Sequence, residues 1–141
     1  NFKLNPQSNN LNMKKGYYTL KIGRKDMIDA ASFHEIGDYY FKQKNFVSSL
    51  EFFEKAVNLN PYELTYKENL ANTHLKLGNF QTAADILTEL IDVDGSTSIK
   101  VKYLRVLAYL NLKDFTTACK YIEEIKDNVL VKDIELERFC N

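Results

Sequence analysis

The chain has 141 residues, of which 45% are hydrophobic and 27% charged, and its formal net charge is zero. This is the composition of an ordinary globular chain with one domain, and it excludes a fibrous class and wholesale disorder. No apolar run reaches the roughly 18 to 20 residues that a membrane-spanning helix needs, so we expect no membrane span.

Residues 1–26 are predicted to form a basic, asparagine-rich N-terminal arm. Six basic and no acidic residues fall within the first 25 positions, which leaves 13 basic and 19 acidic residues, a net charge of −6, for the remainder. Such an arm suits an acidic protein surface. Nucleic acid is excluded as a partner, because the acidic body would repel it and no nucleic-acid-binding module is present. The arm residues expected to contact a partner are Lys14, Lys15, Tyr17, Tyr18 and Lys21.

From position 27 onward the sequence repeats itself three times. Phe46, Phe80 and Phe115 are 34 and 35 residues apart. Small residues recur three positions later, and apolar residues recur seven and ten positions later, where helix faces interlock. The equivalent positions are Ser49, Ala83 and Ala118; Phe53, Leu87 and Ile122; Ala56, Leu90 and Ile125; Gly37, Ala71 and Val106; and Tyr40, His74 and Tyr109.

Each repeat divides into two helical patterns separated by a short polar break. Gly78 suits a left-handed helix cap, and Pro61 follows a helix end. An additional helix over 130–140 is predicted to cover the last repeat, as terminal caps do in repeat proteins. The six other helices are predicted near 27–43, 46–59, 62–77, 80–92, 97–112 and 115–127.

The first repeat resembles the tetratricopeptide repeat (TPR) pattern. Phe33, Ile36, Gly37 and Tyr40 fall at its W-x2-L-G-x2-Y spacing, while Ser49 and Phe53 fit its A-x3-F spacing and Pro61 its closing proline. The resemblance implies an all-α, right-handed superhelical solenoid of antiparallel helix pairs with a C-terminal capping helix. It gives repeats over about 30–63, 64–98 and 99–129, within a domain over 27–141.

The TPR resemblance also implies a concave groove lined by the first helix of each repeat. Chaperone-binding members hold a C-terminal carboxylate there with a clamp of five basic and asparagine residues, two of which are matched by Asn69 and Lys100. His34, Asp38 and Leu104 stand where lysine, asparagine and arginine would be required, which disfavours a chaperone-tail adaptor. The residues expected to line the groove are His34, Asp38, Phe41, Lys42, Glu68, Asn72, Lys76, Tyr103 and Leu107.

Catalytic, metal and cofactor sites are not predicted. His34 and Asp38 share a helix face at a four-residue spacing, yet the sequence places no nucleophile or second acid beside them. His74 takes the place of a tyrosine in the sister repeats, so we interpret it as a packing residue. The histidines and cysteines lack zinc-ligand spacing, and no phosphate-binding glycine loop is present.

Cys119 and Cys140 form either a disulfide or two buried thiols. Cys119 follows a buried position of a second helix, and Cys140 ends the segment expected to pack near it. The region from Leu104 to Cys140 also resembles the closing segments of TPR proteins from Gram-negative envelopes, where such a cysteine pair recurs. That likeness favours a bacterial cell envelope location, periplasmic or surface, over a cytoplasmic one.

The predicted function is a non-catalytic protein–protein interaction module or scaffold subunit of a larger, multi-subunit assembly. It would bind a protein or peptide through the groove, the arm or both, with Phe41 and Tyr103 as anchors. The alternatives are a regulatory TPR segment of a larger enzyme and the disfavoured chaperone-tail adaptor.

Overall fold

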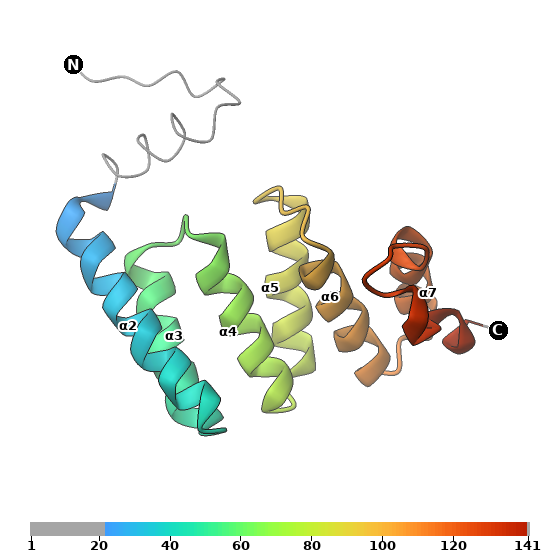
Figure 1. The fold of residues 1–141 in the computed structure, drawn as a ribbon, viewed down its shortest axis with the longest axis horizontal. Helices are drawn as coiled ribbons and strands as arrows, with labels where there is room; N and C mark the ends of the chain where they lie inside the picture. Colours follow the sequence, from blue (N-terminus) through green and yellow to red (C-terminus); the bar gives the residue numbers. More distant parts are fainter. Residues whose placement is uncertain (1–21, 141) are drawn as a thin grey trace, which may run out of the picture. The chain divides into compact units, whose positions relative to one another are not determined.

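The computed structural model describes residues 22–140, and this part of the chain contains helices and turns but no strand. It divides into two compact units, one ending at Tyr66 and the other beginning at Lys67. Six α-helices follow one another along the chain as helix pairs (Figure 1). The predicted arm residues Lys14, Lys15, Tyr17, Tyr18 and Lys21 lie outside the described residues.

The first unit is built on α2 (Arg24–Lys42) and α3 (Phe46–Leu59), which pack against each other (Figure 1). Their closest approach is at Gly37, where an added Cβ atom would lie 2.6 Å from the ring of Phe53. The Ser49 hydroxyl donates a hydrogen bond of 2.9 Å to the carbonyl oxygen of Gly37. Glycine is therefore required here by the space that the Phe53 ring occupies.

The second unit holds most of α4 (Leu64–Lys76) and all of α5 (Phe80–Asp92), α6 (Ile99–Asn111) and α7 (Phe115–Ile125). Helix α6 packs against both α5 and α7. Its first turn is fixed by Ser98, whose side chain accepts a hydrogen bond from the amide of Val101, and Asp114 caps α7 in the same way through Thr117. Such caps satisfy amides that a helix leaves unpaired at its start.

The turn inside each repeat has the same backbone conformation. One residue adopts a positive φ, and the next amide donates to the carbonyl five residues before it, as in a helix end closed by a left-handed residue. The sequence revealed this role only for glycine, whereas lysine fills it in the other two turns. The left-handed residues are Lys44, Gly78 and Lys113, and the bonds run from Asn45 to Tyr40, Asn79 to His74 and Asp114 to Tyr109, at 2.9, 2.8 and 3.0 Å.

The positions that recur in the sequence form the core of each repeat. Their side chains are almost fully removed from solvent, so the repeated pattern corresponds to repeated packing. The equivalent buried residues are Ser49, Ala83 and Ala118; Phe53, Leu87 and Ile122; Ala56, Leu90 and Ile125; and Gly37, Ala71 and Val106. The prediction of an all-α fold of paired TPR helices is confirmed.

The predicted capping helix over 130–140 does not form as an α-helix. The side chain of Asn128 accepts a hydrogen bond from the amide of Leu130, and Glu135 has a φ of 55°, so regular α-helical bonding is interrupted. Two short 3₁₀ helices form instead, η1 (Lys132–Ile134) and η2 (Leu136–Phe139). The segment still buries apolar side chains against the last helix pair.

Within residues 22–140, none of the helices combines the length and the apolar character needed to cross a lipid bilayer.

Candidate functional site

Helix α2 presents the part of the predicted binding face that belongs to the first unit. The imidazole of His34 stacks on the ring of Tyr66, with 4.7 Å between centroids, and lies 5.3 Å from the ring of Phe53. One turn later, Asp38 forms an ion pair of 2.8 Å with Lys42. The face therefore combines a partly buried aromatic stack with a surface ion pair.

The first unit has an acidic electrostatic character around His34. Burial lowers the pKa of the His34 imidazole below its usual value of 6.5, and the carboxylates of Asp38, Glu63 and Glu35 oppose that shift. Burial likewise raises the pKa of the Tyr66 hydroxyl. At neutral pH His34 is therefore uncharged, and negative charge dominates its surroundings.

Phe41, one of the predicted anchors, belongs partly to the core of the first unit. Its ring lies 5.1 Å from the ring of Phe46 and 6.4 Å from that of Phe53, in tilted or edge-on geometry. Some of its surface remains accessible to a partner. A substitution at Phe41 would consequently alter folding as well as binding.

In the second unit, the predicted binding face lies beside a lysine and combines amide and carboxylate side chains. Lys100, at the start of α6, has 59% of its side chain exposed and lies 3.8 Å from the carboxylate of Glu68. Asn69 and Asn72 are half-buried on α4, and Lys76 is exposed near the end of that helix. The ammonium group of Lys100 is thus only weakly paired.

The predicted residues of α6 divide between surface and core. Tyr103 packs partly against the cluster of Val106 and Ile122, and Leu107 is half-buried. Leu104, at a position where the chaperone clamp requires arginine, is only 7% exposed. Each unit therefore carries its own part of the predicted face.

Two charged residues that depart from the repeat pattern have structural roles that the sequence did not show. The side chain of Lys67 is 12% exposed and pairs with Asp94 at 2.8 Å and Glu89 at 3.7 Å. Lys67 lies 34 residues after Phe33, which fills the large-aromatic position of the TPR pattern in the first repeat. Lysine fills the equivalent place with a partly buried stem and a paired ammonium group. Neither ion pair has a spacing that would have identified it in the sequence.

Arg105 is the other departure, and it lies inside the second unit. Its guanidinium carbon stands 3.4 Å from the ring centroid of Tyr121, and its nitrogens lie 3.8 Å from Asp92 and 3.5 Å from Glu124. The side chain is 3% exposed. Stacking on Tyr121 and two long ion pairs offset part of the cost of burying this charge, whereas the buried Nε atom of Arg105 has no hydrogen-bond partner among the described residues.

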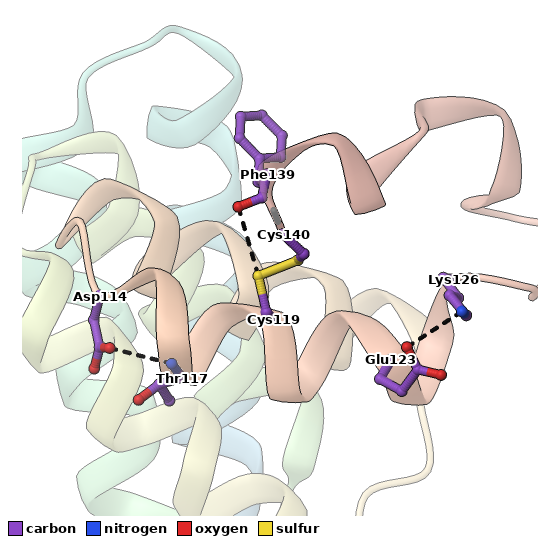
Figure 2. The surroundings of a disulfide bond; sticks show 7 residues. All are labelled: Asp114, Thr117, Cys119, Glu123, Lys126, Phe139 and Cys140. Carbon is purple, nitrogen blue, oxygen red and sulfur yellow. Dashed lines mark hydrogen bonds and ion pairs between the residues drawn. A yellow bond between two sulfur atoms is a disulfide. The ribbon is translucent and has the colours of Figure 1, made fainter.

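Cys119 and Cys140 are joined by a disulfide bond, with their Cα atoms 5.5 Å apart (Figure 2). Cys119 projects from α7, and Cys140 follows directly after η2. The Sγ atom of Cys119 also lies 3.6 Å from the carbonyl oxygen of Phe139. The bond therefore fastens the end of the C-terminal segment to the last α-helix.

The described residues contain no group of three or more histidine, cysteine, aspartate or glutamate side chains that could hold a metal ion. His74 is buried, and its Nδ1 atom lies 3.2 Å from the side-chain nitrogen, Nδ2, of Asn79. His74 thus stabilises the turn between α4 and α5, in keeping with its interpretation as a packing residue.

Comparison with known proteins identifies the repeat. A family model described as tetratricopeptide repeat matches residues 30–63. The solved TPR domain of Arabidopsis OM64 superposes with a TM-score of 0.69 at 24% identity, covering 81% of this chain and 96% of that domain. The chain is a TPR-containing protein. It therefore carries a TPR domain, a fold that mediates protein–protein interactions.

Two further relatives of this TPR domain are connected with chaperones. The Hsp70-Hsp90 organising protein of Plasmodium falciparum (isolate 3D7) is 26% identical over 102 residues. That match covers 65% of this chain and only 18% of the longer relative. The first TPR of Spaghetti (RPAP3), solved with the HSP90 peptide SRMEEVD, has a TM-score of 0.69 at 21% identity and covers 80% of this chain and 91% of that domain.

Proposed function

We propose that this TPR domain is a non-catalytic peptide-binding module whose ligand is the acidic C-terminal tail of an HSP90-type chaperone. The proposal rests on the TPR resemblance, which matches Asn69 on α4 and Lys100 on α6 to two of the five clamp residues. The chaperone connections of two relatives support it. The predicted groove could also bind other proteins, including subunits of a larger assembly.

The chemistry of the second unit suits a carboxylate ligand. The ammonium group of Lys100 is largely exposed, and its 3.8 Å contact with Glu68 is too long for a strong ion pair. The amide of Asn69 can donate hydrogen bonds to a carboxylate. Preformed helices lose little conformational entropy on binding. The contacts of Lys100 and Asn69 with a ligand would therefore contribute to affinity without a large ordering cost.

In the first unit, the residues at the clamp positions differ from those that the TPR resemblance requires. Asp38 introduces a carboxylate where asparagine is required, although its ion pair with Lys42 offsets part of the charge. His34 is uncharged at neutral pH because burial lowers its pKa. The ligand carboxylate therefore depends on Asn69 and Lys100, and we expect weaker binding than a complete clamp would give.

The test is a titration of the full chain with the peptide SRMEEVD, followed by isothermal calorimetry. Lys100→Glu should weaken binding by on the order of tenfold or more, since it replaces attraction by repulsion. Lys120→Glu is the matched control. Lys120 is an exposed lysine on α7, the second helix of the last repeat, and first helices are predicted to line the groove. The Lys120→Glu variant should therefore bind the peptide with unchanged affinity. His34→Lys/Asp38→Asn should strengthen binding by restoring two clamp residues.

The same peptide with an amidated C-terminus shows whether the carboxylate is recognised. Amidation should remove most of the affinity. Absence of binding at millimolar peptide, or equal effects of Lys100→Glu and Lys120→Glu, would refute the proposal.

A second candidate ligand is a peptide segment without a free C-terminal carboxylate. The carboxylates of Glu35, Asp38 and Glu63 around His34 favour it, because they would repel an acidic tail and attract a basic segment. Binding of a lysine-rich peptide of the same length, unaffected by amidation of its C-terminus and by Lys100→Glu, would favour this candidate.

A further inference from the structure

The C-terminal segment after α7 has few attachments to the rest of the second unit. From Val131 onward, the backbone amides that donate hydrogen bonds in the described chain do so to carbonyls within the segment itself, such as Ile134 to Val131 and Cys140 to Glu137. Backbone bonding therefore gives the segment its local turns without fixing it to α6 or α7.

Two aliphatic side chains and one covalent bond attach the segment to the helices. Val131 and Leu136 are 4% and 1% exposed. They lie in one cluster with Val106, Ile122 and Ile125, which come from α6 and α7. The disulfide between Cys119 and Cys140 fixes the far end of the segment, as Figure 2 shows.

The segment's own sequence does not favour its docked conformation. Its helices are short and of the 3₁₀ type, Glu135 takes a left-handed conformation, and Val129 and Leu130 are 73% and 72% exposed. Ordering each residue costs conformational entropy, and the burial of only two aliphatic side chains does not offset that cost for the whole segment. The covalent bond is therefore what keeps the segment in place.

We propose that the Cys119–Cys140 bond is a redox-controlled latch that holds the C-terminal segment over the apolar edge of the last repeat. A dithiol reductant cleaves the S–S bond, gives one hydrogen to each cysteine sulfur, and is itself oxidised to a disulfide. The segment is then released, and Val106, Ile122 and Ile125 become accessible on the edge that it had covered. This regulation goes beyond peptide binding and does not depend on it.

The test is amide hydrogen exchange of the full chain, oxidised and after reduction with dithiothreitol. Thiol counting under denaturing, non-reducing conditions first establishes the state of the cysteines. Reduction should accelerate exchange at Val131, Ile134, Arg138 and Cys140 by on the order of tenfold or more, while amides of α5 keep their protection. Fluorescence of a dye that binds apolar surface should rise in parallel.

Two variants separate the latch from simple packing. Cys119→Ser/Cys140→Ser should show the rapid exchange of the reduced chain without any reductant. Leu136→Ala, kept oxidised, should retain most of the protection because the bond remains.

Two free thiols in the air-oxidised chain, or unchanged protection of the segment after reduction, would overturn the latch. Loss of protection throughout α5 and α6 would overturn it too, because the bond would then support the whole unit. Release of the segment in oxidised Leu136→Ala to the extent seen on reduction would also contradict it.

Discussion

The first and the last helix pair of the described chain use the same repeat register with different side chains. Between α2 and α3, the ring of Phe53 fills the space left by Gly37, and several aromatic rings surround it. Between α6 and α7, the equivalent positions are Val106 and Ile122, and the added chemistry is a buried arginine and a disulfide. Equivalent positions are therefore buried in both helix pairs, and the repeat tolerates different apolar residues at them.

The largest effect should come from removing the ring that fills the first pair. Phe53→Ala should lower the free energy of unfolding by about 3–5 kcal/mol, because it deletes a fully buried ring and leaves a cavity. Urea unfolding followed by circular dichroism measures this change. Phe115→Ala is the control, since that ring is 46% exposed, and it should cost far less. Equal losses from the two variants would show that burial does not govern their contributions.

An intermediate effect is expected at Arg105 in the last pair. Arg105→Ala should destabilise the chain by about 2–3 kcal/mol, chiefly through lost packing against Tyr121, because its acidic partners are partly exposed. Arg105→Met retains the volume and removes the cost of burying a charge, so it should stay within about 1 kcal/mol of the wild type. Unfolding of both variants in urea measures the two changes. If methionine were as damaging as alanine, the ion pairs would be the main contribution.

The smallest effect concerns pH and the first unit. Burial lowers the pKa of His34 in the folded chain, so the unfolded chain takes up the proton first as pH falls below 6.5. The stabilising contribution of neutral His34 is present above pH 6.5 and is lost as pH falls from there through the lowered pKa. The decline in stability over this range should be smaller in His34→Gln, measured as urea midpoints from pH 7.5 to 5. Parallel pH profiles for the two chains would exclude this contribution.

Much of the fold was predictable because it depends on periodicity. Helix bounds differ from the predicted ones by only a few residues, and most of the residues that recur at fixed offsets are buried. The prediction of a capping helix over 130–140 was wrong, because the segment forms two short 3₁₀ helices. The short apolar pattern near DIELERF fits an α-helix and such turns equally well. Left-handed lysines at positions 44 and 113 were not predictable, because lysine carries no local signal for a positive φ.

The candidate site was less accessible to sequence reasoning. The TPR resemblance assigned Asn69 and Lys100 to clamp positions, but the partners of charged residues come from segments distant in the chain. Lys67 pairs with Asp94, and Arg105 stacks on Tyr121. No spacing rule connects such residues, so their roles depend on the folded arrangement.

The sequence by itself determined the repeat, its helix pairs and the identity of the small residues at close contacts, because periodic burial is encoded locally by residue size and polarity. Only the tertiary structure decided how unusual residues are accommodated. Burial lowers the pKa of His34, Lys67 and Arg105 find their compensating charges, and the segment ending at Cys140 covers the last repeat. These properties arise from contacts between residues far apart in the chain, and such contacts exist only after the helices have packed.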